Sequence, residues 1–280
     1  MVRRYYQDKR GRLPLNPGDT DARWRALGPK PAVLAYKQHV LADDNGFILA
    51  QEITHSTARD VDPVPAVIDQ SPIRVRILTA DTGYSSGELR RELQARGAEV
   101  HIPLHTRHLQ NRKRREGFHL RNPRELICPA GKVLRRSTYY QKDATWLYAA
   151  RVSDCSVCSR RSECLRPSAK RRTLQLSTFE PEFIRASVIN STARHRRLLS
   201  QRKTVVEGVF SHLDQTGFDR TRRRGLDRVQ AEGFLVALGH NVLKAVKHVL
   251  GPGKGGRQRK APPEARALCP GLTPLFQHSL

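Results

Sequence analysis

The sequence predicts a mixed α/β fold, and two observations support this prediction. Two β-rich runs, VLAYKQHVLAD from Val33 and FILAQEIT from Phe47, flank the dipeptide Asn45-Gly46, which is typical of a β-hairpin. A third run, IRVRILTADTGYSS at residues 73–86, is followed by the pattern of a short helix and then by AEVHIPL, a further short strand. The order hairpin, connection, strand, helix, strand indicates a mixed sheet with flanking helices.

Asp81 lies at the carboxyl end of the third predicted strand, where open α/β sheets place their ligands. Gly83 allows a sharp turn directly after it, and Ser85 or Ser86 can cap a helix that we expect over residues 87–96. An aspartate in an ordinary surface turn is the plain alternative. The two interpretations differ in whether Asp81 has partners elsewhere in the chain.

The composition divides the chain into five expected segments. Proline and glycine interrupt its first part, and ten Lys or Arg residues face two acidic residues between positions 105 and 136. We expect an extended basic arm at 1–31, the first part of the α/β domain at 32–104, a basic, cysteine-bearing insertion at 105–180, the helical remainder of the domain at 181–250 and a disordered tail at 251–280.

The charge balance indicates a polyanionic partner. Lys and Arg outnumber Asp and Glu by 51 to 26, which gives a formal net charge of +25, and dispersed cationic side chains bind phosphate backbones by releasing counterions. The aromatic content of 6% is low for a protein that stacks on single-stranded bases, which favours duplex DNA. Because no apolar run approaches the roughly 20 residues of a transmembrane helix and the first residues lack an apolar signal core, we expect a cytoplasmic protein without membrane binding.

Four cysteines form a candidate metal site in the basic insertion. Cys155 and Cys158 are a C-x2-C pair, Cys164 follows them, and Cys128 completes the four thiolates that a structural zinc ion takes. The spacing differs from that of the standard zinc fingers, so reduced and partly buried thiols are the alternative. Cys269 lies apart in the Pro- and Gly-rich tail and is excluded from the site.

The part of the chain after the insertion has the pattern of long helices. Apolar residues between Val206 and Leu213 fall on one helix face, and Glu207 lies beside that face. A surface ion pair is the plain alternative role for this carboxylate. A last helix repeats apolar residues that should pack on the sheet, namely Leu235, Leu238, Val242, Val246 and Val249.

Cationic side chains surround the candidate acid of this helical part. Lys203 precedes Glu207 by about one helical turn, and Arg222, Arg223 and Arg224 follow after the helix. We predict that these four cations contact DNA phosphates, while solvated surface charge is the alternative.

Together these features resemble the DDE-type transposases of bacterial insertion sequences, whose catalytic domain is an RNase H-like sheet. The order and spacing of several elements carry the resemblance, which runs from about Asp19 to Leu250. Its elements are DTDARW (19–24), the hairpin YKQHVLADDNGFILAQEIT (36–54), TADTGYSS (79–86), ICPAGK (127–132), the CSVC pair and RKTVVEGVFSHLDQTGFDRTRRRGLDRVQAEGFLVALGHNVLK (202–244).

By this resemblance Asp81 corresponds to the second acid of the catalytic triad and Glu207 to the third. Such carboxylates hold two Mg²⁺ ions, about 3.5–4 Å apart, which activate the attacking oxygen and stabilise the leaving one. The implied reaction is phosphodiester cleavage at the transposon ends, followed by attack of the released 3′-hydroxyl on target DNA. The implied partners are double-stranded DNA and, in the active form, a second copy of the chain, at the nucleoid of a bacterial cell.

Two departures from the family pattern bear on activity. The family's first acid ends a strand ahead of the hairpin, whereas the eighteen residues before Asp19 contain no strand-like run, so we expect this acid to be missing and the chain to be truncated at its N-terminus. Where related transposases often carry Tyr, Arg and Lys around the third acid, this chain has Ser200, Lys203 and Asp214. A sheet without its first strand would also leave hairpin backbone groups unpaired at a central position.

Three functions stay open on the sequence alone. They are a transposase whose copy here is active or inactive, a basic DNA-binding remnant without catalysis, and a stand-alone RNase H-like nuclease. Metal-dependent cleavage that needs Asp81 and Glu207 separates the first function from the second. Joining of DNA strands separates the first from the third.

Overall fold

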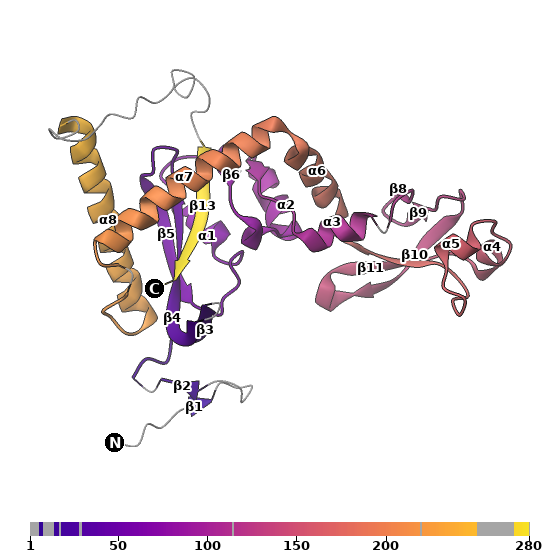
Figure 1. Ribbon diagram of the computed structural model, residues 1–280, viewed down its shortest axis with the longest axis horizontal. Helices are drawn as coiled ribbons and strands as arrows, with labels where there is room; N and C mark the ends of the chain where they lie inside the picture. The colour runs from indigo at the N-terminus through magenta and orange to yellow at the C-terminus, as the bar shows by residue number, and fades with distance from the viewer. Residues whose placement is uncertain are drawn as a thin grey trace. The chain divides into compact units, whose positions relative to one another are not determined.

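Figure 1 shows the computed structural model, which has the mixed α/β fold that the sequence predicts. The chain forms two compact units: unit 1 comprises Met1–Pro103 and Ile189–Leu280, and unit 2 comprises Leu104–Val188. The structure describes residues 6–7, 14–16, 18–27, 30–113, 115–218, 220–250 and 272–279.

The predicted hairpin provides the longest strand of unit 1. Strands β4 (Lys30–Ala42) and β5 (Ile48–His55) are antiparallel. The Asp43 carboxylate accepts a hydrogen bond of 3.0 Å from the backbone N–H of Asn45, and Gly46 adopts a φ of +80° that suits glycine. The Asn-Gly turn therefore closes the hairpin, which confirms the prediction.

The strand, helix, strand order that follows is also confirmed. Strands β6 (Ile77–Thr79) and β7 (Glu99–His101) are parallel, and helix α2 (Gly87–Ala95) connects them. The Ser86 hydroxyl caps α2 by accepting a backbone hydrogen bond of 3.4 Å, and Gly97, with a φ of +81°, follows its end. The other short elements of unit 1 are β1 (Tyr6–Gln7), β2 (Pro14–Leu15), β3 (Arg23–Leu27), α1 (Val64–Asp69) and the 3₁₀ turn η1 (Thr82–Tyr84).

The central strand of the unit 1 sheet comes from the last part of the chain. Strand β13 (Leu272–Ser279) lies between β4 and β6, antiparallel to β4 and parallel to β6 (Figure 1). The strand order is β3-β4-β13-β6-β7, and β5 also pairs with β4. We expected residues 251–280 to be disordered and the hairpin to keep unpaired backbone groups at a central position. Strand β13 corrects both expectations, because the facing edges of β4 and β6 bond its backbone; the rest of that segment lies outside the described residues.

Two long helices pack on this sheet. They are α7 (Ala193–Gln215) and α8 (Leu226–Leu250). Val209 and Leu213 of α7 are buried against Val40 and its neighbours on the hairpin, together with Ala237 of α8. Among the described residues, no helix combines the length and the apolar character that a membrane span requires.

Helix α8 packs by a different face from the one that its apolar repeat predicts. Its buried residues are Val229, Gly233, Ala237 and His240. A Cβ atom at Gly233 would lie 2.7 Å from the Gln51 side chain, so glycine is needed for this close approach. The residues predicted to pack on the sheet are instead 45–80% exposed, and we call them the α8 stripe: Leu235, Leu238, Val242, Val246 and Val249.

Unit 2 contains a five-stranded antiparallel sheet with the order β12-β11-β10-β9-β8. Its buried cluster consists of Leu126, Leu134, Tyr148, Ala150 and Leu176. The elements of the unit are α3 (Thr106–Lys113), β8 (His119–Asn122), β9 (Glu125–Ile127), β10 (Val133–Tyr140), η2 (Gln141–Asp143), β11 (Thr145–Ala149), α4 (Val152–Ser156), α5 (Arg161–Cys164), β12 (Thr173–Ser177) and α6 (Glu180–Ser191), which ends in unit 1.

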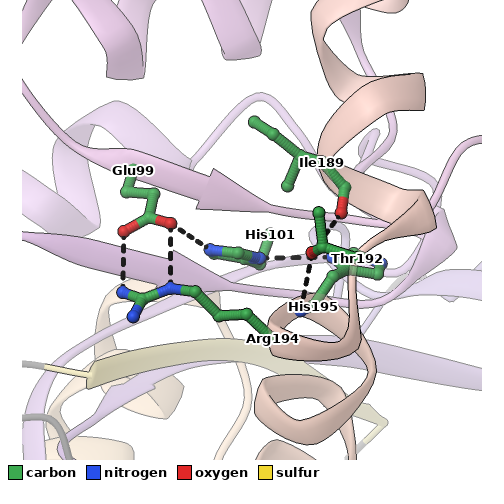
Figure 2. A network of polar contacts seen from close by, with 6 residues as sticks. All are labelled: Glu99, His101, Ile189, Thr192, Arg194 and His195. Atoms are coloured by element: carbon green, nitrogen blue, oxygen red, sulfur yellow. Dashed lines mark hydrogen bonds and ion pairs between the residues drawn. The ribbon is translucent and has the colours of Figure 1, made fainter.

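A polar network with two buried imidazoles fixes the start of α7 to β7 (Figure 2). His101 Nε2 donates to the Glu99 carboxylate at 2.8 Å, so its Nδ1 is left to accept a hydrogen bond from His195 Nδ1 at 3.2 Å. Arg194 pairs with the same carboxylate at 2.9 Å, and the Thr192 hydroxyl caps α7. Both imidazoles are almost fully buried, and burial lowers the pKa of His195 to about 4.

Deleting residues 272–280 is expected to destabilise unit 1 by about 3 kcal/mol or more, because β4 and β6 would each lose a bonded neighbour. Urea unfolding followed by Trp24 fluorescence, with Trp146 replaced by Phe, measures this effect in unit 1. A synthetic peptide with the sequence of residues 268–280 should restore part of the lost stability. An unchanged unfolding midpoint in the shortened chain would contradict the central position of β13.

Acidification is expected to destabilise unit 1 through His195. The folded-state pKa of about 4 lies below the ordinary value of 6.5, so the unfolded chain binds more protons between these values and stability falls as the pH drops through this window. Between pH 7 and pH 5, the His195→Asn chain should lose about 2 kcal/mol less than the unchanged chain in the same urea assay. His39, whose pKa burial also lowers to about 4, remains in both chains. Equal pH slopes would show that His195 is not the titrating group.

Candidate functional site

Asp81 directly follows the end of the buried strand β6, as predicted. Its carboxylate accepts a hydrogen bond of 2.8 Å from the backbone N–H of Gly83, and this contact starts the turn η1. The side chain is exposed at the carboxyl end of the strand. The turn that the sequence predicts is therefore present, and it presents a carboxylate at the sheet edge where ligands of α/β folds bind.

A second carboxylate, Asp60, lies near Asp81. A Cβ atom built on Gly83 would lie 3.0 Å from Asp81 Oδ1 and 3.2 Å from Asp60 Oδ2, so these two oxygens are at most about 6 Å apart. Lys37, on strand β4, donates to Asp60 at 2.6 Å and to the Ala58 carbonyl at 2.7 Å. Asp60 was not among the predicted site residues, because it lies in an irregular connection without periodicity. The only local signal in the sequence is Gly83, whose missing side chain leaves room for both carboxylates.

Buried polar groups support the Asp81 turn from beneath. Tyr84, which ends the turn, is fully buried, and its hydroxyl lies 3.4 Å from His39 Nδ1. His39 Nε2 lies 3.0 Å from the Thr54 hydroxyl. Burial raises the pKa of Tyr84 well above its ordinary value, and the charges of Asp81 and Asp60 raise it further. The hairpin and the Asp81 turn are thus joined by neutral side chains at neutral pH.

Glu207 is an exposed residue of α7. Its nearest ion-pair partner is Lys203, one helical turn earlier, at 3.7 Å. In the described ranges, no three His, Cys, Asp or Glu side chains lie close enough together to hold a metal ion. The neighbour that the structure places beside Asp81 is therefore Asp60, and the catalytic role of Glu207 remains a prediction.

The acids of the DTDARW element have structural contacts. The Asp19 carboxylate accepts a hydrogen bond of 2.5 Å from the Tyr36 hydroxyl and one of 3.3 Å from the Gly225 N–H. The Asp21 carboxylate accepts one of 2.9 Å from the N–H of Leu226, the first residue of α8. A negative charge at a helix N-terminus stabilises the helix, so these acids anchor α8 to the hairpin.

The predicted DNA-contacting cations lie at the surface. Arg222, Arg223 and Arg224 are exposed in the connection between α7 and α8. Glu232 holds this connection by accepting hydrogen bonds of 2.5 Å from the Thr221 hydroxyl and 3.3 Å from the Arg222 N–H. The connection therefore presents three guanidinium groups to solvent from a fixed backbone.

The four predicted zinc ligands share one cavity of unit 2. Cys128, Cys155, Cys158 and Cys164 all line it, and all four are free, half-buried thiols. Burial raises the pKa of the Cys164 thiol, and the Arg172 guanidinium opposes this rise. The cysteines that the sequence placed in one candidate site thus converge in space.

Comparison with known proteins identifies one family for this chain. The family model described as "Transposase DDE domain" matches residues 12–242, which is most of the chain. No curated protein and no solved structure matches. The match begins before the hairpin and ends within α8, so it covers Asp60, Asp81, Glu207 and the cysteine-bearing unit. The chain therefore belongs to the family of transposases with a DDE domain.

Proposed function

We propose that this chain is a DNA transposase that cleaves phosphodiester bonds and transfers the resulting strand ends, with Asp81 at the centre of the reaction. The observation that supports this most strongly is the position of Asp81 at the carboxyl end of β6 with Asp60 beside it. Membership of the DDE family gives the reaction class. Alternatives are a non-catalytic DNA-binding remnant and an RNase H-like nuclease.

Asp81 and Asp60 offer the carboxylate oxygens that a hard divalent cation such as Mg²⁺ prefers, and a third ligand does not lie beside them in the described ranges. We propose Asp81 and Asp60 as two of its protein ligands and Glu207 as a third. Bound there, Mg²⁺ would lower the pKa of an attacking water and neutralise charge on the scissile phosphate. Lys37, held by the Ala58 carbonyl, keeps the Asp60 carboxylate beside Gly83.

We also propose a role for Asp60 as the first acid of the family, which the sequence did not locate ahead of the hairpin. Strand β13, LTPLFQHS, fills the centre of the sheet next to β6 and contains no acidic residue. Asp60 approaches Asp81 from the connection after β5 instead. We propose that this aspartate supplies the carboxylate that a preceding strand supplies elsewhere in the family.

The surface charge fits duplex DNA as the partner. Phosphate backbones attract a chain with a net charge of +25. We propose phosphate contacts for Lys203 and for the three exposed guanidinium groups of Arg222, Arg223 and Arg224. Such contacts position the DNA without reading its sequence, in the nucleoid of the bacterial cytoplasm.

Asp81→Asn and Asp60→Asn are each expected to lower Mg²⁺-dependent nicking of supercoiled DNA by at least about 100-fold, because each removes a negative oxygen ligand. Isothermal titration with Mg²⁺ should show lost or weakened binding in both variants. Asp62→Asn is the matched control, since Asp62 pairs with Arg59 on the surface at 3.5 Å. Nicking by the Asp81→Asn chain at the rate of the unchanged chain would refute the catalytic role. If nicking survives in Asp60→Asn but not in Asp81→Asn, only the proposed role of Asp60 is refuted.

We further propose that two copies of the chain associate through the α8 stripe. Leu235, Leu238 and Val242 recur at the three- and four-residue spacing of a coiled-coil seam and are 52–69% exposed. Leu238→Lys should raise the dimer dissociation constant about 100-fold in sedimentation equilibrium, since each dimer loses two buried leucines. Val188→Lys, which alters another exposed apolar residue, should leave it unchanged. A monomeric unchanged chain would exclude the dimer.

A further inference from the structure

We propose that unit 2 binds one structural zinc ion through Cys128, Cys155, Cys158 and Cys164. All four side chains line one cavity of about 250 Å³, although they come from two separate parts of the unit. Four cysteine thiolates are the ligand set of many structural zinc sites. The proposal concerns the folding of unit 2 and does not depend on DNA cleavage at Asp81.

The first ligand lies on a tight turn that is shaped to present a thiolate. Cys128 follows β9, and its backbone N–H and carbonyl bond to Lys132 and Gly131 at 2.9 Å each. The N–H of Lys132 then points at Cys128 Sγ, with a separation of 3.4 Å. Gly131 has a φ of +72°, which the turn requires. A backbone donor aimed at sulfur fixes the direction of the Cys128 side chain.

Cys155 lies on the short helix α4 and Cys164 on α5, and Cys158 lies in the connection between these helices. The N–H of Arg172 lies 3.5 Å from Cys155 Sγ, so a second thiol also has a backbone donor. The guanidinium groups of this segment bond to carbonyls: Arg161 to that of Cys155 at 3.1 Å and Arg172 to that of Cys164 at 3.0 Å. These contacts hold the chain that carries the thiols without using the sulfur atoms.

The type of ligand in the cavity selects the metal. Soft thiolate ligands favour zinc over the hard cations that carboxylates bind. Charged side chains of both signs also line the cavity: the cations Lys132, Arg160 and Arg172 and the acids Glu116, Asp154 and Glu163. The identity of the metal is therefore inferred from the four cysteines and not from the surrounding charge.

The size of unit 2 gives the ion a structural purpose. Its main buried cluster has five residues, and Cys128 and Cys155 pack against its edge. A bound metal adds stability to a small unit beyond what its hydrophobic core supplies. As described, the thiols line the cavity without three of them meeting at ligand distance. Zinc binding therefore requires the Cys128 turn and the segment of α4 and α5 to close until each sulfur lies about 2.3 Å from the ion.

Metal analysis of the purified full chain tests this proposal. The unchanged chain, prepared under reducing conditions without chelator, should contain about one zinc ion per chain. Cys158→Ser and Cys164→Ser should each lower the content to less than about a tenth of that value under dialysis against a weak chelator. Neither side chain packs in the buried cluster of unit 2, which favours retention of the fold. Cys269→Ser is the matched control and should keep its zinc.

Cobalt substitution gives a second readout. Co²⁺ added to the reduced, metal-free chain should produce the visible absorption bands of a tetrahedral thiolate complex, and zinc should abolish them. An unchanged chain with native circular dichroism, no zinc and no cobalt bands would overturn the proposal. So would equal zinc content in the Cys158→Ser, Cys164→Ser and Cys269→Ser chains. A mass lower by two hydrogens, from a Cys155–Cys158 disulfide in the folded chain, would also overturn the proposal, because these two sulfurs would then not bind zinc.

Discussion

The structure of unit 1 depends on the position of β13 between β4 and β6. Among the described strands, β4 and β6 have no pairing with each other, and β13 bonds to both. Without it, the sheet would separate into the hairpin with β3 and the parallel pair β6-β7. Asp60 follows the hairpin and Asp81 follows β6, so the two carboxylates belong to opposite sides of this seam. The separation between Asp60 and Asp81 therefore depends on β13, the strand that completes the sheet.

Side-chain contacts also join the two sides of this seam, and the side chains that make them are buried and uncharged. His39, on β4, lies against Tyr84 in the Asp81 turn. Burial keeps His39 neutral by lowering its pKa to about 4. His195 ties α7 to β7 in the same neutral state. The fold therefore relies on uncharged imidazoles inside a chain of high positive charge, since each additional buried cation would add to the repulsion.

Local signals in the sequence predict the elements whose partners are near in the chain. Asn45-Gly46 predicts the hairpin, and Ser86 predicts the start of α2. The pairing of β13 joins residues more than 190 positions apart, which no periodicity reveals. The buried face of α8 was predicted wrongly because the prediction followed its large apolar residues. Close approach to the sheet needs small residues, and the buried face contains Gly233. Asp60 was not predicted for a related reason: its neighbour Asp81 lies near it only in the folded chain.

The two proposed metal sites differ in the chemistry of their ligands, and this difference makes them separable. Asp60 and Asp81 offer hard carboxylate oxygens, while the cavity of unit 2 is lined by four thiols. Mg²⁺ exchanges readily from the first kind of site, whereas a tetrathiolate holds zinc tightly. Lys37, paired with Asp60, competes with a cation for that carboxylate, so the magnesium site should be weak until DNA phosphate adds further oxygen ligands. Cleavage should accordingly depend on added Mg²⁺ under conditions in which unit 2 keeps its zinc.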